Sequence, residues 1–170
     1  MPNESEVQAL LEPTPFIPLE SGYLNVLRIF GIIQSAVLTG ILLVAISAIN
    51  SKFDRDLPYW AFGIALLALA FWLICVSPAR RFAAWGYRVE VDELRIKRGV
   101  LTREETIVPL GRVQHIDVGQ GAIERGCGVT YLALHTAGMA HNVVTLPGLA
   151  RETAEALRDI IRTHIRADLE

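Results

Sequence analysis

IFGIIQSAVLTGILLVAISAIN, at residues 29–50, contains no charged side chain. A second uncharged stretch, LPYWAFGIALLALAFWLICVSPA, follows at residues 57–79 after a short charged loop at 51–56. Each stretch is longer than the roughly 20 apolar residues that cross the hydrocarbon core of a bilayer. A helix can cross as an open-ended segment because it satisfies its own backbone hydrogen bonds. The sequence therefore predicts a transmembrane hairpin over residues 23–79, with helices at about 25–49 and 57–77.

Small residues recur every four positions in the first stretch, which includes Gly31 and Gly40. Such spacing lets two helices approach closely in a membrane, either within the hairpin or between two copies of the chain. Gln34 is the strongly polar side chain deep in this stretch, and we expect it to form a hydrogen bond between helices.

The segment before the hairpin, residues 1–22, is acidic and contains four prolines. It lacks the basic region of a signal peptide, so we expect an extended or disordered tail. Basic residues flank the outer ends of the hairpin at Arg28, Arg80, Arg81 and Arg88, whereas the loop has only Lys52 and Arg55. Because basic residues accumulate on the cytoplasmic side, we expect both termini to be cytoplasmic.

Residues 80–170 suffice for one small domain with its own core. Their acidic and basic side chains nearly balance, which argues against nucleic-acid binding. Apolar and polar residues alternate from Tyr87 onward, as in strands. Six strands are predicted, at about 87–91, 94–100, 102–108, 113–118, 129–135 and 143–146, with Pro147 and Gly148 ending the last. A helix with one apolar face follows from Ala154 to Ile165, so the domain is of the α+β class.

Several short pieces recur in a specific order and spacing. They are IDVGQG at 116–121, IER before GCG at 123–128, HTAG at 135–138, PGL at 147–149 and AEALR at 154–158. Together with the two-helix hairpin, they resemble the YdbS-like bacterial pleckstrin-homology (PH) family over about residues 20–165. Cys127 departs from the family pattern, where a bulkier residue is common.

The resemblance implies a PH-like barrel of two antiparallel sheets capped by a C-terminal helix. It also implies a protein of the bacterial inner membrane, with no catalytic residues to carry over. Relatives of this kind often accompany a larger membrane protein that bears several copies of the domain. The expected partners are therefore the bilayer and either a second copy of this chain or such a multi-PH protein.

The candidate chemical motifs are weak. Gly119 and Gly121 lack the remaining signature of a nucleotide loop, so we interpret them, with Gly126 and Gly128, as turn and bulge glycines. Arg125 is interpreted as a structural anchor for this loop. The residues that could bind metal, which are the four histidines and Cys75 and Cys127, lack convincing ligand spacing. His115 and His135 are expected to be partly buried, and His135 could instead face His141 across a hairpin turn. No cofactor, metal or enzymatic activity is predicted.

Basic side chains near the membrane are the remaining candidates for a site. They are Arg80, Arg81, Arg95, Lys97, Arg98 and Arg103. Anionic headgroups could add about 1 kcal/mol for each basic residue near the surface. Neighbouring glutamates could neutralise the cluster, however, and Arg80 and Arg81 already serve as topology signals. Two functions stay open at this point, protein assembly at the membrane as the first and binding of anionic lipid as the alternative.

Overall fold

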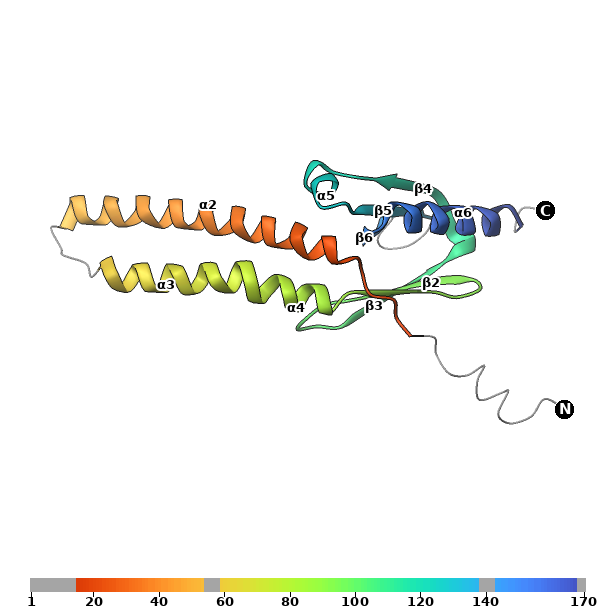
Figure 1. The fold of residues 1–170 in the computed structure, drawn as a ribbon, viewed down its shortest axis with the longest axis horizontal. Helices are drawn as coiled ribbons and strands as arrows, with labels where there is room; N and C mark the ends of the chain where they lie inside the picture. Colours follow the sequence, from red (N-terminus) through yellow and green to blue (C-terminus); the bar gives the residue numbers. More distant parts are fainter. Residues whose placement is uncertain (1–14, 54–58, 138–142, 168–170) are drawn as a thin grey trace, which may run out of the picture.

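The computed structural model describes residues 15–53, 59–137 and 143–167, and it consists of a long helical hairpin that projects from a two-sheet domain (Figure 1). The first limb is α2 (Ser21–Phe53). The returning limb contains α3 (Tyr59–Phe71), a π-helical turn (Trp72–Val76) and α4 (Ser77–Ala83). Both limbs extend further toward the domain than the sequence predicted. The loop between them at 54–58, including Arg55, lies outside the described residues.

The hairpin presents its apolar side chains outward. Val44 on α2 is 70% exposed and Leu67 on α3 is 73% exposed. Two segments, Ser21–Ile49 and Phe62–Ala83, have the length and apolar composition that cross a membrane. An apolar surface of this extent is not tolerated in water, whereas lipid solvates it.

The two limbs pack closely at the domain end, where a proline widens the returning helix. Pro78 has no N–H, and its ring would clash with the carbonyl four residues earlier. The turn before it is π-helical, and the Ser77 N–H bonds to the Trp72 carbonyl. A Cβ at Gly31 would collide with the carbonyl oxygen of Leu73 in this turn, whereas Gly40 has nothing within 4 Å. Of these two glycines, Gly31 is therefore the one at which the limbs lie too close for a side chain.

Two three-stranded antiparallel sheets form the domain, each in chain order. The first contains β1 (Gly86–Val89), β2 (Glu93–Arg98) and β3 (Glu104–Pro109). After a 3-10 turn at Leu110–Arg112, the second contains β4 (Val113–Gly119), β5 (Thr130–Thr136) and β6 (Val143–Leu149), with the short helix α5 (Ala122–Gly126) between β4 and β5. Helix α6 (Arg151–Ala167) ends the described chain.

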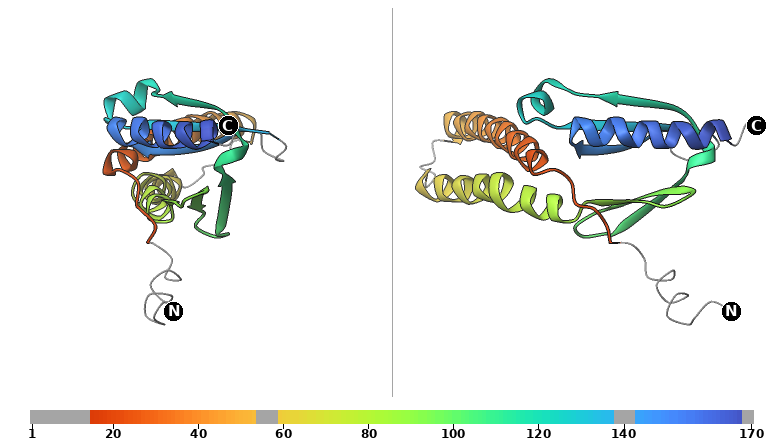
Figure 2. Two further views of the ribbon diagram at one scale, coloured as in Figure 1. Left: turned by 90° about the vertical axis from the view of Figure 1, so that its right-hand side faces the viewer. Right: turned by 45° about the vertical axis from the view of Figure 1, so that its right-hand side comes forward.

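The core lies between the sheets and α6, which packs along the second sheet (Figure 2). Its members alternate along the strands and recur every three or four residues on the helix. They include Leu94, Ile96 and Val108 from the first sheet, Leu132, Leu134 and Leu146 from the second, and Ala154, Leu157 and Ile161 from α6. This arrangement confirms the predicted α+β, PH-like fold, although the two sheets do not close into a continuous barrel.

Two sequence expectations need correction in the second sheet. Strand β6 does not stop before Pro147 but continues to Leu149, with a register shift opposite β5 and Gly148 at φ +69°. A proline is tolerated there because β6 is an edge strand and one of its sides needs no ladder hydrogen bond. The glycine-rich segment also contains α5, which has no apolar periodicity to reveal it.

The predicted N-terminal tail also needs correction, because its last residues belong to the domain. Ile17 exchanges two backbone hydrogen bonds with Tyr87 on β1, at 2.7 and 3.0 Å. Leu19 is only 5% exposed and joins the core. Ile17 and Leu19 alternate with polar or turn residues over too short a stretch to predict a strand. Their extended conformation depends on pairing with β1. Residues 1–14 lie outside the described part of the chain.

Candidate functional site

The six basic candidates fall into three structural groups. Arg95 and Arg98 lie on β2 and are paired with carboxylates. The Arg95 guanidinium contacts Glu93 and lies 3.4 Å from both Glu90 and Glu105, and Arg98 Nε lies 3.1 Å from Glu104. The hydrogen bond from Arg95 to Glu93 is the main reason why the pKa of Arg95 is raised. These two arginines are locally neutralised.

Arg80, Lys97 and Arg103 converge on one groove of about 520 Å³, which we call the basic groove. Antiparallel pairing places Lys97 of β2 opposite Gly86 of β1, directly after α4. The end of β2 therefore returns to the helix that carries Arg80. Among the described residues, no ion pair involves these three cations and no carboxylate lines the groove. The full lining is Phe16, Pro18, Arg80, Ala83, Ala84, Trp85, Gly86, Lys97, Gly99, Val100 and Arg103.

Aromatic side chains form part of the basic groove. The Lys97 Nζ lies 5.5 Å from the centre of the Phe16 ring, which holds the ammonium by a cation–π contact. Trp85 follows α4 directly, where an amphipathic ring suits the membrane interface. The sequence did not indicate Phe16, because its position depends on the pairing of Ile17 with β1.

The loop between β2 and β3 forms the rim of the basic groove and lies beside α4 (Figure 1). Gly99 turns the chain with φ +104°, and its Cβ would collide with Thr102. Leu101 at the tip is 95% exposed. Sequence analysis missed this residue, although a leucine between turn residues breaks the strand pattern and could have drawn attention to it.

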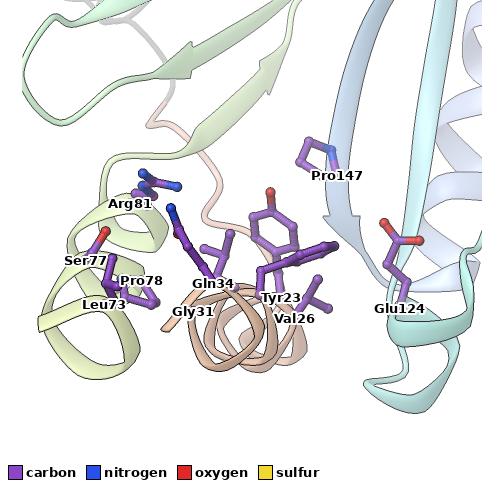
Figure 3. Close-up of a pocket in the computed structure, with 12 residues that line it drawn as sticks. Tyr23, Val26, Gly31, Gln34, Leu73, Ser77, Pro78, Arg81, Glu124 and Pro147 are labelled. Carbon is purple, nitrogen blue, oxygen red and sulfur yellow. The ribbon is translucent and has the colours of Figure 1, made fainter. Parts of the chain in front are cut away.

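Arg81 faces a different cavity, one residue further along α4. This cavity has a volume of about 360 Å³ and lies between the helical hairpin and the second sheet (Figure 3). Gln34 of α2 also lines it and forms no hydrogen bond with any described residue, so the expected bond between helices is absent. We call this space the interfacial cavity.

The contacts of the glycine-rich segment at residues 119–128 stabilise the local fold. A Cβ at Gly119 would collide with the Tyr131 ring. Gly128 has a φ of +69°, which favours glycine. The Gly121 N–H donates to the Glu124 carboxylate, which caps α5. The Arg125 side chain is exposed and forms no hydrogen bond or ion pair with another described residue. Its loop is held by backbone bonds, which include that of the Arg125 N–H to Gly121.

His115 and His135 lie opposite each other on β4 and β5. Their Nε2 atoms lie 2.8 and 3.0 Å from the two oxygens of Asp117. The His115 side chain is 68% exposed, so the expected partial burial is wrong for this residue, which shares an exposed face of β4 with Asp117. The two Nε2 atoms approach separate carboxylate oxygens of Asp117, and the described residues contain no cluster suited to a metal ion. His141 lies outside them, and Cys75 and Cys127 are free thiols.

Comparison with known proteins agrees with the fold. The model of the bacterial PH domain family matches residues 27–165. The UPF0699 transmembrane protein YdbS of Bacillus subtilis is 32% identical over 144 residues, which cover 81% of this chain and 85% of YdbS. The UPF0699 transmembrane protein YdbT of the same organism is 29% identical over 102 residues, which cover 58% of this chain and 20% of YdbT. No solved structure matches.

Proposed function

Because this chain belongs to the bacterial PH domain family, we propose that it is a two-pass protein of the inner membrane whose basic groove binds anionic lipid headgroups at the cytoplasmic surface. It is a membrane protein with a PH-like domain, and the specific role is our proposal. The observation that carries it is the convergence of Arg80, Lys97 and Arg103, without a lining carboxylate, where the domain meets a membrane-spanning helix.

Position and charge both support this role. Arg80 lies in the last turn of the second apolar segment, so the groove opens at the level of the headgroups. Each basic residue near an anionic surface contributes about 1 kcal/mol, so three contribute about 3 kcal/mol, or roughly a hundredfold in affinity. The exposed Leu101 on the groove rim can enter the apolar edge of the bilayer and hold the loop there. The role is one of binding, because the groove presents cations and aromatic rings to a ligand.

The test measures lipid binding by two variants of the full chain, both purified in mild detergent. Each variant replaces a different set of basic side chains with glutamine. The triple variant Arg80→Gln, Lys97→Gln, Arg103→Gln is expected to bind added phosphatidylglycerol at least about tenfold more weakly than the wild type. The control Arg95→Gln, Arg98→Gln changes cations of the same domain that already have carboxylate partners, and it is expected to retain binding. Equal binding by the triple variant and the wild type would refute the proposal.

Assembly at the membrane is the second candidate function. The 102 residues that match YdbT cover only one fifth of that protein, so the family contains both short and long chains. Homologous domains of such chains can pack on one another, which favours assembly. Purification of the tagged full chain in mild detergent, followed by mass measurement, tests this candidate. A homo-oligomer or a complex with a longer PH-domain protein is expected, and a monomer without a membrane partner would contradict it.

A further inference from the structure

The interfacial cavity is a second hollow at the junction of hairpin and domain, separate from the basic groove. Figure 3 shows that it lies between α2, α4, α5 and the end of β6. Its lining residues are Tyr23, Val26, Leu27, Phe30, Gly31, Gln34, Leu73, Ser77, Pro78, Arg81, Glu124 and Pro147. No residue lines both spaces, although Arg80 and Arg81 are neighbours in the chain.

The cavity is apolar at one end and charged at the other. Leu27, Phe30 and Leu73 come from the membrane-spanning parts of the two limbs. Arg81 and Glu124 lie at opposite sides of the charged end, with the Tyr23 ring between them (Figure 3). An amphipathic molecule oriented like a membrane lipid matches this division.

The side chains of Arg81 and Glu124 are both available to a ligand. Among the described residues, Arg81 forms no ion pair, and Glu124 is not paired with a cation. One Glu124 oxygen accepts the Gly121 N–H, which fixes the carboxylate at the start of α5 and leaves the other oxygen available. The Gln34 amide also extends toward the cavity from α2 (Figure 3). Among the described residues, the site thus offers one cation and one amide without side-chain partners, and one carboxylate with a free oxygen.

A small residue closes the space between the two limbs below the cavity. Gly31 contacts the carbonyl of Leu73 in the π-helical turn, so the two limbs meet below the cavity. π-helical turns in longer helices are frequent at functional sites.

We propose that the interfacial cavity binds the headgroup of one zwitterionic phospholipid with a primary ammonium, of the phosphoethanolamine type. Arg81 receives the phosphate through charge-assisted hydrogen bonds, and Glu124 accepts hydrogen bonds from the ammonium. The acyl chains pass Phe30 and Leu27 into the bilayer. A volume of about 360 Å³ lies within the range of small-molecule pockets and accommodates a headgroup rather than a whole lipid.

Charge complementarity distinguishes this ligand from other lipids. An anionic headgroup without an ammonium would place negative charge near Glu124, which is unfavourable. A quaternary choline group carries the positive charge but has no N–H to donate to the carboxylate. A soluble ligand would have to enter through a lining that belongs mainly to the apolar membrane-spanning segments. The ethanolamine headgroup satisfies both charges and supplies the donors.

The test measures binding of phosphatidylethanolamine and phosphatidylcholine to the full chain in mild detergent, by native mass spectrometry. The wild type is expected to prefer phosphatidylethanolamine by about tenfold, as for one hydrogen bond to a charged group. Glu124→Gln is expected to bring the two affinities within about twofold. Its amide oxygen can still accept the Gly121 N–H, so α5 keeps its cap. Arg81→Gln is expected to weaken both lipids to a similar extent.

Arg98→Gln is the control, because it removes an arginine of the same domain that is paired with Glu104 and lines neither the interfacial cavity nor the basic groove. It is expected to leave the preference unchanged. A Glu124→Gln variant that keeps the wild-type preference would overturn the proposal, and so would a wild type that binds both lipids equally. This outcome is separate from the test of the basic groove, which uses other residues and an anionic lipid.

Discussion

Residues of the same type acquire different roles here according to their neighbours. Arg98 and Arg103 flank one loop between β2 and β3, yet Arg98 is paired with Glu104 while Arg103 lines the basic groove. Arg80 and Arg81 are adjacent on α4 and face different cavities. The free energy of an exposed ion pair is small, so the pairs on β2 matter less for stability than for limiting which cations can meet a ligand.

Tyr87 shows how burial changes the ionisation of a single side chain. It is 5% exposed on β1, and burial, followed by the negative charge of Glu20, raises its pKa above the ordinary 10.0. The folded state therefore favours the neutral phenol, which contributes stability below pH 10. This contribution is lost as the pH rises through the raised pKa of the folded protein.

We expect the free energy of unfolding of the wild type to fall above about pH 10, and Tyr87→Phe to remove part of this decrease. Denaturant unfolding at several alkaline pH values measures the decrease, and tyrosinate absorbance measures the ionisation of Tyr87 by difference between the two proteins. The same alkaline loss in both proteins, with Tyr87 titrating at its ordinary pKa, would contradict the expectation.

At the scale of elements, periodicity predicted most of the domain. Alternation along β1 to β5 and the apolar face of α6 arise from the core itself, so they are visible in the sequence. The continuation of β6 past Pro147 was not visible, because it depends on β6 being an edge strand. Helix α5 is too short to show a period. The sites were less predictable. Arg95 is paired with carboxylates while Lys97 lines the basic groove, and this difference depends on strand pairing and on the position of α4.

The contact between α2 and the π-helical turn predicts a difference between two glycines of one helix. Gly31→Ala introduces a methyl group that collides with the Leu73 carbonyl, so the limbs must separate at a cost of about 1–3 kcal/mol. Gly40→Ala is the matched control, because nothing lies within 4 Å of its Cβ position. Unfolding in mixed micelles of dodecyl maltoside and sodium dodecyl sulfate measures the free energy of unfolding of the two variants. Equal stability of the two variants would show that the limbs do not meet at Gly31.

At the scale of the whole molecule, the domain is attached to the hairpin at two points. The chain enters through residues that pack on the second sheet, where the Glu20 N–H bonds to the Gly148 carbonyl and Gly22 lies against the carbonyl of Cys127. It leaves through α4 into β1 of the first sheet, with only Ala84 and Trp85 between them. Because each limb meets a different sheet, the domain has a fixed orientation on the hairpin. The basic groove and the interfacial cavity consequently both lie where the hairpin joins the domain.

The side of the membrane that carries the domain can be tested with the two native cysteines. Cys127 follows α5 in the domain and is partly exposed, whereas Cys75 lies in the second segment that is long and apolar enough to cross a membrane. If the domain is cytoplasmic, a membrane-impermeant maleimide will label Cys127 in inside-out vesicles but not in intact spheroplasts. Cys127→Ser will abolish that labelling, because maleimide reacts with an accessible thiolate and Cys75 faces lipid. Labelling of Cys127 in intact spheroplasts would place the domain on the outer side and would exclude headgroup binding at the cytoplasmic surface.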